Sequence, residues 1–413
     1  MIARARQHSG ALFLLVATTV ANVLGYGYQV VQARLLAPAD YAALTALFGV
    51  LILEQVSSQV IQSATATLAA RYRARDEQDA LHAFVRRWSV RVAAFAAVIG
   101  LVILVTSPLL ASALSLPPYA VALLGVTLFF ALVFTFSIGL LQGLARFVWM
   151  GTALIVQAGS RLAIGVALVV LGLGVNGAFT GATLAIVISL VVAALPLFTL
   201  LRAARGSTVT HELGAAETRF FALSAVILLA YAALTNIDAV LARSLLSPDA
   251  AGAYAGAITM GKIVLFAPIA VGFLLLERTA SAHARGEDTE RMLYLALGFV
   301  LVTSGLVAAA YILIPGVLVP IVVGSQYPDT VRIVPIYGVA ALANALLNLW
   351  IAYFIGRGEM RVGFLLALAV AAEVVLLLTT VSDAVSMARV VLVVALATQA
   401  VSVATFVLRR LRG

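Results

Sequence analysis

Long blocks of apolar residues, separated by short polar connections, dominate this sequence. Most blocks hold about twenty or more residues, the length that a helix rising 1.5 Å per residue needs to cross a hydrocarbon layer of roughly 30 Å. The pattern therefore predicts an all-α integral membrane protein with about twelve spanning helices. The expected spans are residues 10–33, 41–70, 88–111, 119–144, 147–172, 178–201, 219–244, 252–276, 292–315, 331–355, 361–382 and 385–408.

The composition agrees with a membrane environment. Of the 413 residues, 63% are apolar and 10% are charged, whereas a soluble domain carries about 25% charged residues. The mean hydropathy is +1.12. No connection between the expected spans exceeds about 17 residues, so we expect no separate soluble domain.

In a soluble protein, a net charge of +9 would suggest binding to nucleic acid. Whether that interpretation applies here depends on where the charged residues lie along the chain. When the N-terminus is placed inside, most Lys and Arg residues fall at the termini and in the even-numbered connections. The positive-inside rule then predicts a multi-pass protein of the cytoplasmic (inner) membrane with both termini in the cytoplasm and no nucleic-acid partner. Arg4 and Arg6 precede an apolar run without a cleavage pattern, which we interpret as a retained first helix.

An internal repeat divides the chain. The segment ARLLAPADYAAL at 33–44 matches ARSLLSPDAAGAY at 242–254, and further matches follow at a nearly constant offset of about 210 residues. Six spans per half is an even number, so both halves point the same way and form a parallel repeat. We therefore expect two six-helix lobes, residues 1–205 and 206–413, with the substrate site between them.

Polar residues form a stripe on the second expected span. Glu54, Ser58 and Gln62 recur at helical spacing, with Gln55 and Gln59 beside them. Polar atoms are costly in lipid, so the stripe faces either a water-filled cavity or another helix. The length of the stripe favours a cavity lining.

The seventh expected span places Tyr231, Thr235 and Asp238 on one helical face, with Asn236 adjacent and Arg243 at the outer end. Two interpretations stay open for the charged residues. Asp238 couples transport to an ion, or Asp238 and Arg243 form a structural ion pair.

Four charged residues lie near the predicted membrane midplane: Glu54, Arg161, Lys262 and Glu373. A charge at a helix centre costs roughly 2.5–3.5 kcal/mol on insertion scales, so these positions point to a role. The repeat equates Arg161 with Glu373, which either pair across the lobes or serve their own lobes. Lys262 is the single lysine of the chain.

Trp350 and Tyr353 lie near an inner helix end, so we assign them to an aromatic belt rather than to sugar stacking.

The candidate site residues fall into two classes, substrate-binding residues and coupling or charge-pair residues. The predicted substrate-binding residues are Lys262, Arg161, Gln55, Ser58, Gln59, Gln62 and Asn236. The predicted coupling or charge-pair residues are Glu54, Asp238, Glu373 and Arg243.

Enzymatic chemistry has little support in the sequence. Cysteine is absent, and the four histidines (His8, His82, His211 and His283) lie outside the expected spans. We therefore expect no metal site, no cofactor and no catalytic centre.

Three segments carry a resemblance to a known family: ARLLAPADYAAL, NIDAVLARSLLSPDAAGAY and GKIVLFAP. The chain resembles the polysaccharide-transporter branch of the multidrug/oligosaccharidyl-lipid/polysaccharide exporter superfamily, the Wzx-like flippases. The resemblance implies two six-helix lobes around a central cavity and export of a lipid-linked oligosaccharide by alternating access. Peptidoglycan-precursor flippases are also similar, but they usually have fourteen helices and an Arg-Asp pair where this chain has Tyr28 and Gln29.

We therefore expect a flippase for a polyprenyl-diphosphate-linked oligosaccharide in cell-surface polysaccharide biosynthesis. Its expected partners are this substrate and membrane lipids, with protons or sodium ions as candidate coupling ions. The alternatives are a MATE-like drug/cation antiporter, a membrane glycan polymerase or ligase, and a non-transporting scaffold. A polymerase or ligase normally needs a large outer loop, which the expected connections do not provide.

Overall fold

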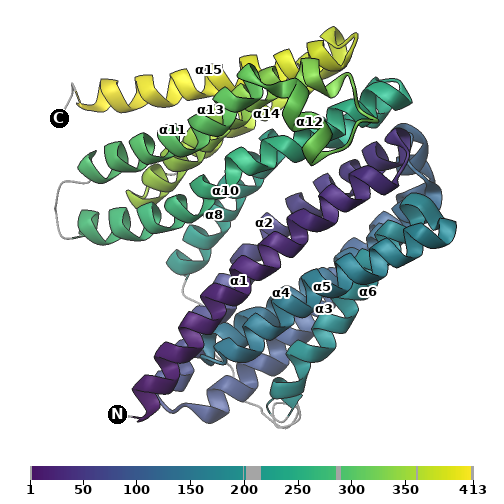
Figure 1. The fold of residues 1–413 in the computed structure, drawn as a ribbon. Helices are drawn as coiled ribbons and strands as arrows, with labels where there is room; N and C mark the ends of the chain where they lie inside the picture. The colour runs from purple at the N-terminus through teal and green to yellow at the C-terminus, as the bar shows by residue number, and fades with distance from the viewer. Residues whose placement is uncertain (1, 199, 201–214, 285–289, 360, 411–413) are drawn as a thin grey trace. The chain divides into compact units, whose positions relative to one another are not determined.

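The computed structural model describes residues 2–198, 200, 215–284, 290–359 and 361–410, and within these ranges it contains helices and no strand. The fold class expected from the sequence is confirmed (Figure 1). The first part contains α1 (Ile2–Leu35), α2 (Pro38–Ala74), α3 (Gln78–Ala113), α4 (Pro118–Gly143), α5 (Phe147–Leu168), α6 (Gly174–Ala194) and a short 3₁₀ turn (Leu195–Leu197). The second contains α8 (Ala215–Leu234), α9 (Ile237–Leu245), α10 (Pro248–Ala284), α11 (Glu290–Leu313), α12 (Pro315–Val322), α13 (Thr330–Gly356), α14 (Val362–Thr380) and α15 (Ala384–Arg410).

Prolines mark where several helices begin. α2, α4, α10 and α12 each start at a proline: Pro38, Pro118, Pro248 and Pro315. The first helical position lacks an intrahelical partner for its N–H group, so a residue without that group is tolerated there, and its fixed φ suits the helix. Local sequence chemistry therefore sets these boundaries.

Each expected span overlaps a described helix. Within the described ranges, nine helical stretches are long and apolar enough to cross a membrane, and one of them, Phe147–Leu197, covers two expected spans. α2 and α10 lie outside these nine stretches, and α2 carries the polar stripe. The number of twelve crossings stays a prediction.

The two expected spans within Phe147–Leu197 are joined by a tight kink rather than by a loop. A π-helical turn (Val169–Leu173) follows α5, and α6 begins at the next residue. Gly172 has φ +89° in this turn, a conformation that residues with a Cβ rarely adopt. The chain therefore reverses direction within a few residues.

The chain separates into two compact units. Unit 1 comprises Met1–Leu36 and Glu54–Ala225, and unit 2 comprises Ala37–Leu53 and Val226–Gly413. The boundary crosses α2, whose first half therefore packs in unit 2 and whose second half packs in unit 1. The expected lobes, residues 1–205 and 206–413, stay a prediction: they are the two parts that we expect to move during transport.

In unit 1, α5 packs against α6 and α1, and α3 packs against α4. Its core contains Phe84, Phe134, Leu140 and Leu141. In unit 2, α13 is the central helix and packs against α10, α11 and α15 (Figure 1). Each unit therefore has an apolar interior of its own.

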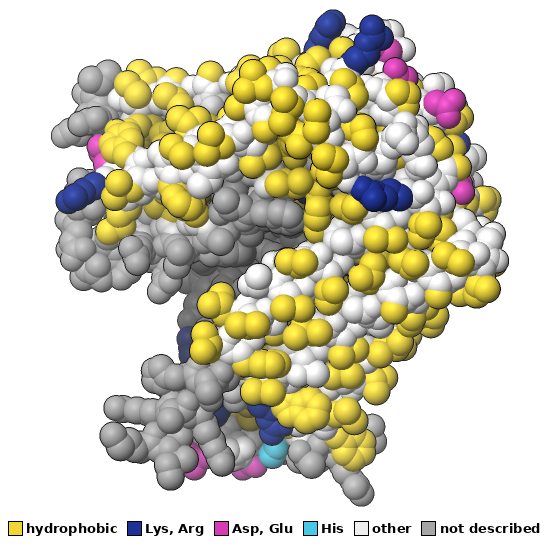
Figure 2. Space-filling view, in the orientation of Figure 1, with side chains coloured by type: hydrophobic (Ala, Val, Ile, Leu, Met, Phe, Trp, Pro, Cys, Tyr) yellow, Lys and Arg dark blue, Asp and Glu magenta, His cyan; other side chains and the backbone are white. Residues whose placement is uncertain are grey.

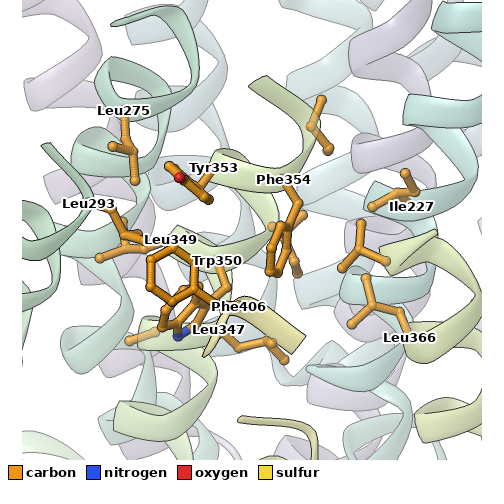
Figure 3. Packing of buried hydrophobic residues seen from close by; sticks show 14 of the residues in the cluster. Ile227, Leu275, Leu293, Leu347, Leu349, Trp350, Tyr353, Phe354, Leu366 and Phe406 are labelled. Atoms are coloured by element: carbon orange, nitrogen blue, oxygen red, sulfur yellow. The ribbon is translucent and has the colours of Figure 1, made fainter. Parts of the chain in front are cut away.

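The aromatic residues near the end of α13 belong to this interior. Trp350 is 3% exposed and Tyr353 is 1% exposed, and both rings lie close to Phe406 of α15 (Figure 3). Trp350 also stacks on Phe354 with ring centroids 6.0 Å apart. The predicted aromatic belt at Trp350 and Tyr353 is therefore wrong, because these rings pack against α15 instead of facing the membrane interface.

Large apolar side chains also cover much of the outer surface, as Figure 2 shows on one face. Phe364 is 79% exposed, Leu313 78% and Leu171 75%. Exposed apolar area of this extent is unfavourable in water and suits contact with lipid tails. The protein is therefore an integral membrane protein.

Candidate functional site

The predicted site residues divide between the two units. Unit 1 holds the polar stripe on α2 and Arg161 on α5, whereas unit 2 holds the candidates on α9, α10 and α14. Within unit 2, Asp238 and Glu373 lie near enough for their charges to interact. The unit 1 candidates are Glu54, Gln55, Ser58, Gln59, Gln62 and Arg161; those of unit 2 are Asn236, Asp238, Arg243, Lys262 and Glu373.

The stripe on α2 is partly engaged in hydrogen bonds. The Ser58 hydroxyl donates to Oε1 of Glu54, one helical turn away. Gln62 Nε2 donates to Gln142 Oε1 on α4, 2.9 Å away. Gln55 is exposed and Gln59 is half-buried. One end of the stripe thus bonds to a neighbouring helix, while its remaining amides are open to a polar ligand.

Arg161 lies on α5 against α1. Its guanidinium carbon is 5.2 Å from the centre of the Tyr28 ring, within the range of a cation–π contact. The Tyr28 hydroxyl donates to the carbonyl oxygen of Ala178 on α6, 2.9 Å away, and this bond fixes the ring. Arg161 is half-buried as a whole residue, and its Nε atom is buried. The arrangement presents a cation in a defined orientation.

The seventh span is not one continuous helix. α8 ends at Leu234 and α9 begins at Ile237, with Asn236 between them at φ −142°. The Asn236 side chain donates to the carbonyl oxygen of Ala232, 3.0 Å away. Such a local bond competes with the helical backbone pattern. The helix on which Tyr231, Thr235 and Asp238 were expected to share a face is therefore interrupted before Asp238.

The break places Asp238 in the first turn of α9, where it is buried. The Tyr254 hydroxyl donates to Oδ2 of Asp238, 2.8 Å away, and Tyr337 contacts the same carboxyl group. The rings of Tyr254 and Tyr337 meet edge to face, with centroids 5.6 Å apart. Two phenols and a helix N-terminus thus stabilise this carboxyl group.

Glu373 of α14 is buried near enough to Asp238 for the two charges to interact. Within the part of the chain that the structure describes, both carboxylate oxygens of Glu373 lack a hydrogen-bond partner. Two ionised carboxylates in an apolar interior repel each other, so a proton or a cation would stabilise the pair. The chemistry of this pair is therefore suited to exchange of a small cation.

The cationic residues of unit 2 lie on α9 and α10. Arg243 is half-buried in the last turn of α9, and among the described residues no ion pair joins it to Asp238. Lys262 is half-buried on α10. Its neighbour Gly261 packs on the Tyr337 ring, since a Cβ there would lie 2.6 Å from a ring carbon. Lys262 thus lies on the helix that also provides Tyr254.

Three contributing residues were missed by sequence reasoning: Tyr28, Tyr254 and Tyr337. Tyr254 was noted as part of the repeat, but its spacing from Asp238 carries no signal across a helix break. Tyr28 and Tyr337 reach their partners from neighbouring helices, so only tertiary packing reveals their roles. Among the described residues, no group of three or more His, Cys, Asp or Glu lies together as a metal site would require.

Comparisons with known proteins place these features in context. A family described as "Polysaccharide biosynthesis protein" matches residues 8–272. No curated protein matches the sequence. Among solved structures, an inward-facing multidrug resistance MATE family transporter of the MOP superfamily has a TM-score of 0.76 at 14% identity, covering 94% of this chain and 97% of that one.

Two further structures share the fold. The eukaryotic MATE transporter AtDTX14 has a TM-score of 0.67 at 16% identity, covering 98% of this chain and 96% of that one. A MOP superfamily transporter from Pyrococcus furiosus has a TM-score of 0.58 at 16% identity, covering 96% of this chain and 95% of that one. Its binding pocket is described as having reversed polarity that suggests a different function. At these identities the likeness shows a common fold.

Proposed function

We propose, from the premise that this chain belongs to the polysaccharide biosynthesis protein family, that it flips a lipid-linked oligosaccharide from the inner to the outer leaflet of the cytoplasmic membrane. The lipid is a polyprenyl diphosphate, and the glycan is used for cell-surface polysaccharide. In this proposal the protein acts as a membrane transporter and not as an enzyme.

The family match carries the proposal, because it assigns the chain to polysaccharide biosynthesis while solved structures show the same fold in transporters. A polysaccharide made from cytoplasmic precursors has to cross the membrane, and a lipid carrier keeps each unit at the membrane while it does so. A transporter fold in a polysaccharide family therefore suits the flipping step.

The site residues fit the two ends of such a substrate. Arg161 and Lys262 supply positive charge for the diphosphate, and arginine offers a planar fork of donors that matches phosphate oxygens. Gln55, Gln59 and the other amides and hydroxyls of the site offer donors and acceptors for sugar hydroxyls. Movement of residues 1–205 against 206–413 would expose the substrate to each leaflet in turn.

The buried pair of Asp238 and Glu373 is the proposed coupling site. Uptake of a proton or sodium ion would relieve the repulsion between the two carboxylates and stabilise one conformation over the other. Glu54, which accepts a hydrogen bond from Ser58, is a second candidate on α2. Both termini lie in the cytoplasm in this proposal.

A second candidate function is export of a cationic drug in exchange for an ion. The observation that favours it is the multidrug resistance transporter fold together with the buried carboxyl pair, which would also attract an organic cation. The two functions require opposite ligand charge, so they are separable by experiment.

The proposal is tested with the purified protein in vesicles that contain a fluorescent polyprenyl-diphosphate oligosaccharide in one leaflet. Wild-type protein should move it to the other leaflet, and an imposed pH or sodium gradient should change the rate. Lys262→Ala should insert normally but lose most flipping, whereas Lys262→Arg should retain part, because it keeps the charge. Cation uptake by wild-type protein without oligosaccharide flipping would establish the second candidate instead.

A further inference from the structure

α1 and α5 run side by side in unit 1, and glycines of α5 face larger residues of α1. A Cβ on Gly151 would lie 2.8 Å from the Cβ of Ala17, and one on Gly165 would lie 2.7 Å from the Tyr28 ring. The residue numbers rise together along both helices, so the two helices are parallel. At both contacts, glycine on α5 lets α1 approach closely.

The arrangement is reversed between these two contacts. Here α5 provides the long side chain of Arg161, and α1 provides a glycine, Gly25. A Cβ on Gly25 would lie 2.7 Å from a terminal guanidinium nitrogen of Arg161, and among the described residues no other atom lies within 4 Å of it. For Gly27, two residues further along the same helix, no atom of the described part of the chain lies within 4 Å of a Cβ. The absence of a side chain at position 25 therefore makes room for the guanidinium group.

Tyr28, one turn beyond Gly25, completes the support. Its ring lies 5.2 Å from the guanidinium carbon, and its hydroxyl is bonded to α6. The ring therefore cannot move aside without breaking that bond. α1 thus restricts the guanidinium from two consecutive turns, with space at Gly25 and a fixed aromatic ring at Tyr28.

We propose that Gly25 and Tyr28 are positioning residues that hold the Arg161 guanidinium in the orientation that binds a diphosphate group. This inference rests on the proposed function, because it explains how one cation of the proposed substrate site is oriented for binding. A guanidinium that is already oriented loses less rotational freedom on binding, and a two-point contact with phosphate oxygens depends on that orientation. Displacing the group by a methyl at position 25 should weaken binding without removing the charge.

The test measures binding of farnesyl diphosphate to the purified full-length protein in detergent. Gly25→Ala should raise the Kd about tenfold, the loss expected for a misaligned charge-assisted contact. Gly27→Ala is the matched control and should leave the Kd unchanged, because the same methyl meets no atom of the described residues within 4 Å. In vesicles, Gly25→Ala should raise the substrate concentration for half-maximal flipping more than it lowers the maximal rate.

A double-mutant cycle separates positioning from helix packing. In an Arg161→Ala background, Gly25→Ala should change neither the Kd nor the Tm, since the guanidinium group that the methyl would meet is gone. If Gly25→Ala fails to fold with Arg161 present but folds with Arg161→Ala, the steric coupling is supported. If it fails to fold in both, or lowers the Tm equally in both, Gly25 serves helix packing and the proposal is overturned.

The remaining outcomes distinguish this proposal from the proposed function. Equal Kd values for Gly25→Ala and Gly27→Ala, with a wild-type protein that binds and flips, would overturn the positioning role alone. A wild-type protein that neither binds farnesyl diphosphate nor flips the oligosaccharide would overturn the proposed function. If phosphatidylglycerol competes as strongly as farnesyl diphosphate, the Arg161 guanidinium binds phospholipid headgroups in general. That result would overturn diphosphate recognition.

Discussion

At the scale of single residues, three of the charged side chains inside the expected spans have polar or aromatic partners. Glu54 accepts a hydrogen bond from Ser58, Asp238 accepts one from Tyr254, and Arg161 lies over Tyr28. Each contact offsets part of the cost of taking a charge or polar group out of water. Tyr254 bonds to Asp238 and the Tyr28 ring lies beside Arg161, so both of these contacts are made by neutral side chains.

Glu54 provides a residue-scale prediction. Glu54→Gln keeps the shape and a hydrogen-bonding oxygen for Ser58 but removes the titratable group. We expect normal expression, slower flipping in the vesicle assay and a weaker dependence on an imposed proton gradient. Glu77→Gln is the matched control, because Glu77 lies in a connection near Arg75. Unchanged flipping and gradient dependence in Glu54→Gln would remove Glu54 from the mechanism.

The sequence shows which residues are unusual but not what they contact. A charge in an apolar run is visible in the sequence, and Glu54, Arg161 and Glu373 were identified in this way. Their neighbours depend on the rotation and register of packed helices, which the apolar pattern does not determine. The contact between Arg161 and Tyr28 is of this kind, because it joins α5 to α1.

At the scale of elements, prolines and apolar runs predict where helices lie, whereas the break in the seventh span has no such signal. Thr235 and Asn236 are neither glycine nor proline, and the apolar pattern continues on both sides. At the break, the Asn236 side chain bonds back to the carbonyl oxygen of Ala232, a local bond that competes with the helical backbone pattern. Its consequence is functional in our proposal, because it gives Asp238 a helix N-terminus inside the span.

The coupling pair leads to a prediction at this scale. Asp238→Asn and Glu373→Gln should each slow gradient-driven flipping to a low but measurable rate while leaving farnesyl diphosphate binding within about twofold of wild type. Because the two carboxyl groups are expected to act as one unit, the double variant should be no slower than either single variant. The measurement is the flipping rate with and without a gradient. Additive losses in the double variant would show that the two groups act separately.

At the scale of the whole molecule, the repeat and the spatial units do not coincide. The repeat assigns all of α2 to the first half, whereas residues 37–53 pack in unit 2. A continuous helix from Pro38 to Ala74 carries no sequence signal of which unit each end contacts. Tyr41 of this segment bonds to the Thr259 hydroxyl, and its ring lies 5.9 Å from that of Tyr327.

The membrane topology is a prediction at this scale. Reporters fused after Arg73 should be read in the cytoplasm, and those after Pro117 or Val175 outside, since positive charge gathers in the connections assigned to the inner side. Reporters after Thr208 and Gly286, which lie outside the described residues, should be read in the cytoplasm. Alkaline phosphatase and fluorescent-protein fusions make the measurement, and a single reversed pair would contradict the twelve-span arrangement.

The last prediction asks which parts of the molecule move. A Cβ on Gly49 of α2 would lie 3.5 Å from the Cβ of Ala239 on α9, a separation that suits a disulfide. The natural chain has no cysteine, so Gly49→Cys with Ala239→Cys introduces the only thiol pair. We expect the pair to cross-link under oxidation.

If residues 1–205 and 206–413 move as the two lobes, this contact has to open in every cycle. The cross-linked protein should then bind farnesyl diphosphate but stop flipping, and a reductant should restore the rate. Each single-cysteine variant under the same oxidation controls for damage by the oxidant. Full flipping by a completely cross-linked protein would show instead that residues 37–53 move with unit 2, so that α2 bends near Leu53 and Glu54, where the two units divide it.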